Sequence, residues 1–162
     1  MMLHNPVRCC AHAAAALLAF LVVTAGGLTA AQADPCDDLA KQLAGQISDL
    51  KVGATRGGVI YLEHPAVKQA WLGCSGRNVT NEISATTTTK KPSKEFLDFV
   101  SAAAALIFTI PKPDALAGAQ RCVGRIGIIR GYNITTRYRK LDIRCGRPKD
   151  ETEITISREK ES

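Results

Sequence analysis

Residues 96–110 read FLDFVSAAAALIFTI, the most apolar stretch outside the N-terminal leader. Asp98 is its single charge, and apolar side chains fall on nearly every face of a helix built from it. A span of a bilayer takes about 20 apolar residues, so this stretch is too short to cross one comfortably. It predicts a helix buried in a protein core, and a helix that binds a membrane or a partner is the alternative.

Strand patterns lie on both sides of this helix in the sequence. Runs of β-branched and aromatic residues, bounded by Gly, Pro and Ser, predict five short strands. They fall near residues 59–62, 70–72, 78–89, 133–145 and 152–156. The apolar positions change phase near Arg139 and Lys140, which predicts a bulge in the fourth strand.

Two more helices are predicted by apolar residues at helical spacing. The first begins at Asp34-Pro35 and continues through Leu50, until Gly53 ends the pattern. The other runs from Asp114 to Gly131, although residues 125–130 also fit a strand that pairs with the next one. Strands, then helices, then strands are typical of an α+β fold. We expect a small antiparallel sheet of about five strands, packed against about three helices and stapled by disulfides.

The first 33 residues have the order of a cleavable signal peptide. Arg8 is their one full charge, residues 13–23 are apolar, and Ala31-Gln32-Ala33 supplies small residues before a cut at Asp34. Gly26-Gly27 interrupts the apolar run before it reaches the length of a membrane span. We therefore expect a periplasmic or secreted protein with no membrane span after cleavage.

Cleavage leaves one domain over residues 34–158 and a frayed charged tail, residues 159–162. Removal of Arg8 with the leader leaves 20 Lys and Arg against 15 acids, and four cysteines remain. These are Cys36, Cys74, Cys122 and Cys145. An even count in an exported chain predicts two disulfides. The cysteines lack C-x-x-C spacing and His64 is the sole remaining histidine, so we expect no metal site and no cofactor.

The pairing of these cysteines depends on the structure around Cys122. If the helix continues to Gly131, Cys122 lies about 13 Å before Gly131 along the helix axis. Cys145 lies up to about 46 Å beyond Gly131 along an extended strand. The pairs Cys36–Cys122 and Cys74–Cys145 then follow, because bridged Cα atoms lie within about 7 Å. If the segment is a hairpin, Cys122 pairs with Cys145 and Cys36 with Cys74. We favour the helical case.

Basic residues are concentrated between Arg121 and Lys149, where nine Lys and Arg face one acid, Asp142. Such a stripe is typical of a surface that binds nucleic acid or anionic lipid. The candidate anion-binding residues are Arg137, Arg139, Lys140 and Arg144. The alternative is an internally paired surface, in which Glu151 or Glu153 of the last strand neutralises Arg137 or Arg144.

No catalytic motif stands out. Glu63-His64 lies near Cys74 and Ser75 in sequence, but adjacent strand residues point to opposite faces, so Glu63 is badly placed to orient His64. Trp71, the one tryptophan, is expected to be a core or edge aromatic, and a contact for a partner is the alternative. We therefore expect a non-enzymatic binding or envelope-associated protein whose ligand is another protein or a small molecule. A polyanion-binding protein and a small secreted hydrolase are the alternatives.

Overall fold

The computed structural model describes residues 35–74 and 79–159, which form three helices and seven strands. The helices are α1 (Pro35–Gln46), α2 (Lys94–Phe108) and α3 (Lys112–Val123). The strands are β1 (Lys51–Arg56), β2 (Val59–Glu63), β3 (Gln69–Cys74), β4 (Val79–Thr87), β5 (Asn133–Tyr138), β6 (Leu141–Gly146) and β7 (Thr152–Glu159). The predicted signal peptide, Ser75 and residues 160–162 of the predicted tail lie outside the described residues, whereas Glu159 belongs to β7.

All seven strands pair antiparallel in one sheet, in the order β1-β2-β3-β4-β7-β6-β5. The first four strands form a meander, and β5, β6 and β7 form a second one. The two meanders join at the centre of the sheet, where β4 pairs with β7. The α+β class and the three predicted helices are thus confirmed, but the sheet has two strands more than the expected five.

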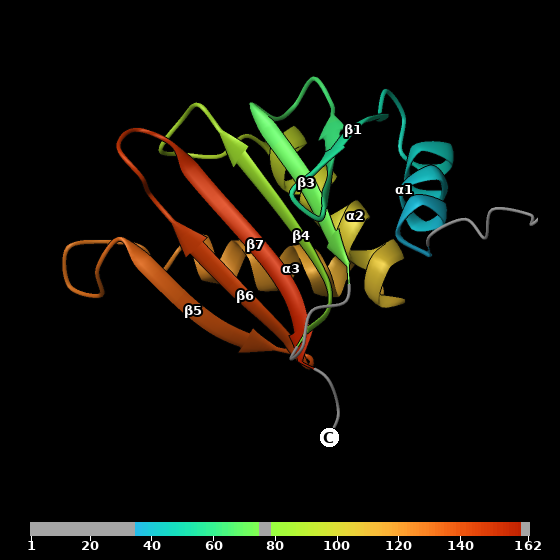
Figure 1. Ribbon diagram of the computed structural model, residues 1–162. Coiled ribbons are helices and arrows are strands. Elements are labelled where there is room, and N and C mark those ends of the chain that lie inside the picture. Colours follow the sequence, from blue (N-terminus) through green and yellow to red (C-terminus); the bar gives the residue numbers. More distant parts are fainter. Residues whose placement is uncertain (1–34, 75–78, 160–162) are drawn as a thin grey trace, which may run out of the picture. The chain divides into compact units, whose positions relative to one another are not determined.

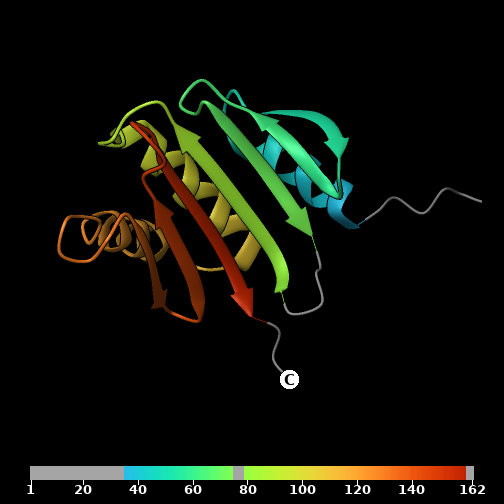
Figure 2. The ribbon, with the colours of Figure 1, turned by 60° about the vertical axis from the view of Figure 1, so that its left-hand side comes forward.

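The three helices cover one face of this sheet (Figures 1 and 2). The first helix, α1, packs against β1, β2 and β3, while α2 lies against β4 and β7, and α3 against β5 and β6. None of the helices among the described residues is long and apolar enough to span a membrane. Each part of the sheet therefore has its own helix on this face, and the core lies between the two layers.

The second helix, α2, contains most of the apolar stretch of residues 96–110. Its buried side chains are Phe96, Phe99, Val100, Ser101, Ala103, Ala104, Ile107 and Phe108. The hydroxyl of Ser93 caps the helix by accepting a hydrogen bond from the N–H of Phe96 at 3.2 Å. Complete burial of a side chain such as Phe96 contributes about 1.5–3 kcal/mol, so the predicted burial of this stretch, which is confirmed, is a major source of stability.

The region of residues 133–145 is a hairpin, and the predicted bulged strand is wrong. Arg139 and Lys140 form a two-residue turn with φ of 50° and 64°, the left-handed conformation that primed hairpin turns require. Ile134 pairs with Cys145, and Thr136 with Ile143, so both strands put these side chains on the same face of the sheet. The change of phase in the sequence therefore marks a reversal of the chain.

The favoured disulfide pairing is also wrong, because the two bridges are Cys36–Cys74 and Cys122–Cys145. Their Cα atoms are 5.7 and 6.0 Å apart, respectively. The segment around Cys122 is helical as predicted, but α3 ends at Val123 and not at Gly131. The hairpin then brings Cys145 back to the end of this helix. A helix at Cys122 and a bridge to Cys145 are therefore compatible.

Candidate binding surface

The face of the sheet opposite the helices, called the outer face here, carries no helix among the described residues. Strand pairing aligns six outward side chains in one row from β2 to β5. In spatial order they are Tyr61, Trp71, Ser84, Thr155, Arg144 and Thr135. This row places the two aromatic residues on one half of the sheet and the arginine on the other.

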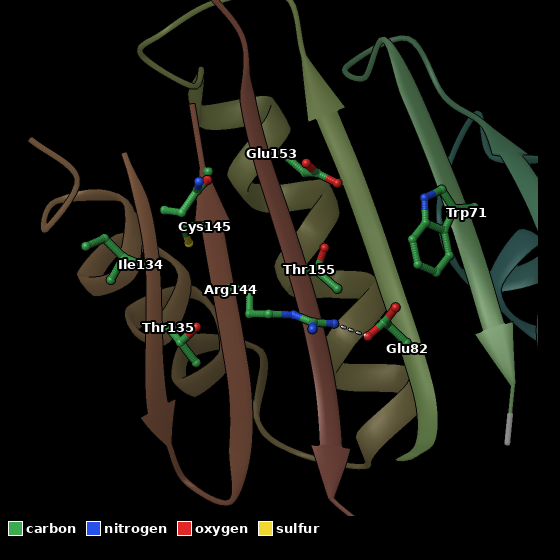
Figure 3. A pocket seen from close by; sticks show the side chains of 10 residues that line it. Trp71, Glu82, Ile134, Thr135, Arg144, Cys145, Glu153 and Thr155 are labelled. Carbon is green, nitrogen blue, oxygen red and sulfur yellow. Dashed lines mark hydrogen bonds and ion pairs between the residues drawn. The ribbon is translucent and has the colours of Figure 1, made fainter. Parts of the chain in front are cut away.

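A second row of the outer face lies beside the first. It contains Gly73, Glu82, Ser157, Asp142 and Arg137, from β3 to β5. Arg144 reaches from the first row across β7 to Glu82 on β4 (Figure 3), and its Nη2 lies 2.7 Å from Oε2 of Glu82. This ion pair spans the middle of the outer face and links the two meanders.

The centre of the outer face is tightly hydrogen-bonded. The hydroxyls of Ser84 and Thr155 are 3.0 Å apart, and the Ser84 hydroxyl also donates to Oε1 of Glu153 at 3.4 Å. Ser84 and Thr155 are buried although they point away from the helices, because longer side chains surround them. The centre of the outer face is therefore a polar floor of hydrogen-bonded side chains.

Trp71 borders an open hollow of about 400 Å³ above this floor (Figure 3). Glu82, Arg144, Glu153 and Thr155 also line the hollow. The indole lies against Gly73, where an added Cβ would stand 3.3 Å from ring atom Cζ3. The missing side chain at position 73 thus lets the half-buried indole lie along its own strand, with part of the ring open to solvent.

The four predicted anion-binding residues come together on β5, β6 and the turn between them. Arg137 and Arg144 extend from the outer face, and Arg139 and Lys140 form the turn. The Nε of Arg137 lies 3.3 Å from Asp142, and Nη2 of Arg139 lies 3.6 Å from Asp114. Internal pairing, the alternative in the sequence analysis, therefore occurs, but the partner of Arg144 is Glu82 and not an acid of the last strand. Anion binding by the four residues stays a prediction.

Two of the residues considered for a hydrolase, His64 and Cys74, have structural roles. Cys74 is bonded to Cys36. The Nδ1 of His64 accepts a hydrogen bond from the N–H of Ala66 at 3.1 Å, and its ring stacks on Phe99 with centroids 4.6 Å apart. Among the described residues, no cluster of three His, Cys, Asp or Glu could hold a metal ion.

Comparisons with protein-family models, with curated proteins and with solved structures find no match to this chain. What this chain binds is therefore inferred from the outer face itself. Glu82 and Tyr61 are residues of this face that the sequence alone does not single out. The alternation of Glu82, Ile83, Ser84 and Ala85 in a strand places Glu82 beside Ser84 on one face, but its pairing with Arg144 involves residues far apart in the chain.

Proposed function

We propose that this protein is an exported, non-enzymatic binding module whose outer face binds another protein. The observation that carries the proposal is the row that joins Trp71 to Arg144, on a sheet face that no helix of residues 35–74 and 79–159 covers. Tryptophan, tyrosine and arginine are the residues most enriched at the energetic centres of protein interfaces. Tyr61, Trp71 and Arg144 lie in this one row, together with the hydrogen-bonded pair Ser84 and Thr155.

The size of the outer face fits such a role. Seven strands spaced by about 4.8 Å, each about 20 Å long, give a face of roughly 600 Å² in projection. A stable protein interface buries about 800 Å² on each partner, so the outer face with its surrounding loops is of the required order. A polar outer face also occurs on sheets that bind nothing, and it is the exposed part of Trp71 that favours binding.

Export is supported by two observations of different kinds. Two disulfides are compatible with an oxidising compartment outside the cytosol, and the leader has the order of a signal peptide. The proposed location is the periplasm or the medium. Sequencing of the N-terminus of protein recovered from the producing cell tests this part, with Asp34 as the expected first residue.

Site-specific photocrosslinking in the producing cell tests the binding surface. A photoreactive residue at Thr135 on the outer face is expected to give a discrete adduct, and Trp71→Ala in the same chain is expected to abolish it. The same residue at Gln120, an exposed position of α3, is the matched control on the helix layer. Adducts of equal yield from both positions, or an adduct insensitive to Trp71→Ala, would contradict the proposal.

Polyanion binding by Arg137, Arg139, Lys140 and Arg144 is the second candidate. It is weaker because Arg137, Arg139 and Arg144 already pair with Asp142, Asp114 and Glu82, respectively. Retention of the protein on heparin, compared with a variant in which Arg137 and Arg144 are replaced by Ala, measures it directly. The control replaces Lys51 and Arg56 of β1 by Ala and removes the same charge elsewhere. Equal retention of the two variants would remove this candidate.

A further inference from the structure

The segment between α3 and β5, residues 124–132, exposes two large apolar side chains. We call it the tip loop. Ile128 is 92% exposed and Ile129 is 98% exposed, and Tyr132 beside them is 57% exposed. The tip loop, drawn in orange, projects from the β5 side of the sheet (Figures 1 and 2). Each of these two adjacent isoleucines is almost fully hydrated and therefore forgoes the free energy that burial of its side chain would contribute.

The exposure of the two isoleucines is built into the loop, because the loop is anchored at its base. Ile126 is buried in the core. The N–H of Gly127 donates to the carbonyl of Gly131 at 3.1 Å, which closes the loop around residues 128–130. Nη1 of Arg125 donates to the hydroxyl of Thr136 on β5 at 3.1 Å. These contacts hold Ile128 and Ile129 at the apex of a closed turn.

Cations surround this apex. Ile128 borders a hollow of about 450 Å³, whose other lining residues are Lys90, Gly127, Tyr132, Arg147 and Lys149. Three of these residues are basic and none is acidic. Lys90 pairs with Asp150 at 2.5 Å, but neither Lys149 nor Arg130 pairs with an acid in residues 35–74 and 79–159.

Arg147 lines this hollow and also carries an unsatisfied donor. Its Nε is buried and has no hydrogen-bond partner in the described part of the chain. Buried donors of this kind almost always have a partner, so the surroundings of this guanidinium are unusual. The apex thus combines protruding aliphatic side chains with a basic hollow at their base.

We propose that the tip loop docks the protein on an anionic lipid bilayer. Ile128 and Ile129 enter the boundary between headgroups and acyl chains, Tyr132 lies at the headgroup level, and Arg130, Arg147 and Lys149 contact headgroup phosphates. A bilayer fits this apex better than a protein does, because a convex apolar tip needs a deformable apolar medium, whereas a protein would need a matching pocket. The tip loop is separate from the row of Trp71 and Arg144, so the inference goes beyond the proposed function.

Binding to lipid vesicles tests the proposal. The oxidised protein recovered from the producing cell is centrifuged with vesicles of phosphatidylcholine alone or mixed with phosphatidylglycerol. We expect binding to the anionic vesicles, and a loss of roughly tenfold in the partition coefficient for each isoleucine changed in Ile128→Ser and Ile129→Ser. Arg130→Ala and Lys149→Ala are each expected to cost roughly fivefold.

Matched controls lie on the opposite edge of the sheet. Val52→Ser removes an exposed apolar side chain from β1, and Lys51→Ala and Arg56→Ala remove exposed cations there. These three variants are expected to bind vesicles like the unchanged protein. The isoleucine variants should keep their fold, since both side chains lie outside the core, and near-ultraviolet circular dichroism checks this.

Three results would overturn the proposal. The first is that the unchanged protein fails to bind anionic vesicles, as it would if the tip loop bound a protein. The second is that binding survives the double isoleucine change and disappears in high salt, which indicates adsorption by charge alone. The third concerns the variant Ile129→Trp in a Trp71→Phe background, whose single tryptophan reports on the apex. If its emission does not shift to the blue when the protein binds vesicles, the apex stays in water.

Discussion

Gly118 of α3 lies directly against Ile143 of β6, and a Cβ on the glycine would stand 2.6 Å from Cδ1 of the isoleucine. The same Cβ would lie 3.2 Å from the ring of Tyr138 on β5. Ile143 is completely buried, so its side chain has little room to move away. The glycine therefore sets how closely α3 approaches β5 and β6.

Gly118→Ala is expected to destabilise the protein by about 1 kcal/mol. Forcing a methyl group into a packed core costs typically 1–3 kcal/mol, which exceeds the gain of up to about 1 kcal/mol in helix propensity. Gly45→Ala in α1 is the matched control, because an added Cβ there meets nothing within 4 Å. Urea denaturation should show opposite signs for the two variants. A stabilised Gly118→Ala protein would mean that α3 and β6 are less tightly packed than described.

The two disulfides are expected to contribute unequally. Loss of a bridge costs typically 2–4 kcal/mol. The cysteines of Cys36–Cys74 are 38 residues apart in sequence, and those of Cys122–Cys145 are 23 residues apart. The chain-entropy model therefore gives the first bridge about 0.4 kcal/mol more stabilisation than the second. Each pair is replaced by serines and the free energy of unfolding is measured. Non-reducing peptide mapping checks the pairing itself, and peptides linking Cys36 to Cys122 would refute it.

The ion pair between Glu82 and Arg144 is expected to add little to stability. Its arginine side chain is 59% exposed, and pairs in such surroundings contribute about 0.2–1 kcal/mol. A double-mutant cycle with Glu82→Gln and Arg144→Ala measures the coupling. The pair of Asp98 with Lys112, which has a similar distance of 2.7 Å, is the control on the helix layer. A coupling of several kcal/mol would make Arg144 a structural residue and weaken its role in binding.

Acid is expected to weaken the cap of α2. The pKa of Glu95 lies below its ordinary value of 4.5, mainly because its backbone N–H donates to the carboxylate and also because the Ser93 hydroxyl does. Because the pKa of Glu95 is lowered in the folded state, its ionised carboxylate stabilises the fold above pH 4.5. This stabilisation is lost as the pH falls through the pKa of the folded state. Glu95→Gln should therefore cost stability at pH 7 and nothing in strong acid. A cost that is the same at both pH values would contradict this.

The buried parts of the fold could be predicted from the sequence. The apolar residues of α2 fall on all faces of the helix, and this composition alone indicates burial. Ile154 and Ile156 alternate with polar residues in β7, as a strand with one apolar face toward the helices requires. In both elements the side chains themselves carry the signal, and both predictions are confirmed.

The two additional strands leave weaker signals. Five of the six residues of β1 are exposed, so its sequence lacks an apolar alternation, and backbone pairing with β2 defines the strand. The turn at Arg139 and Lys140 uses residues that are unusual for a two-residue hairpin, for which Asn-Gly is the common signal. Residues 133–145 therefore predict one strand where the structure has two.

The outer face could be predicted only in part. Trp71 and Arg144 are recognisable as candidate contacts, but their alignment in one row depends on the pairing of β4 with β7. The tip loop is missed for a different reason. Ile126 and Ile128–Ile129 are alike in sequence, and only the end of α3 at Val123 decides that the first is buried and the others are exposed.

The disulfides also divide the chain into two closed loops that follow one another without interleaving. In the export proposed above, the chain leaves a translocation channel with its N-terminus first, and Cys36 and Cys74 are exposed before Cys122 appears. Oxidation in the order of emergence gives the native bonds directly. Uncatalysed rearrangement of wrong bridges takes minutes to hours, and this connectivity makes such a correction step unnecessary. Each native bond thus joins two cysteines that follow one another among the four, so that pairing in the order of emergence produces it without repair.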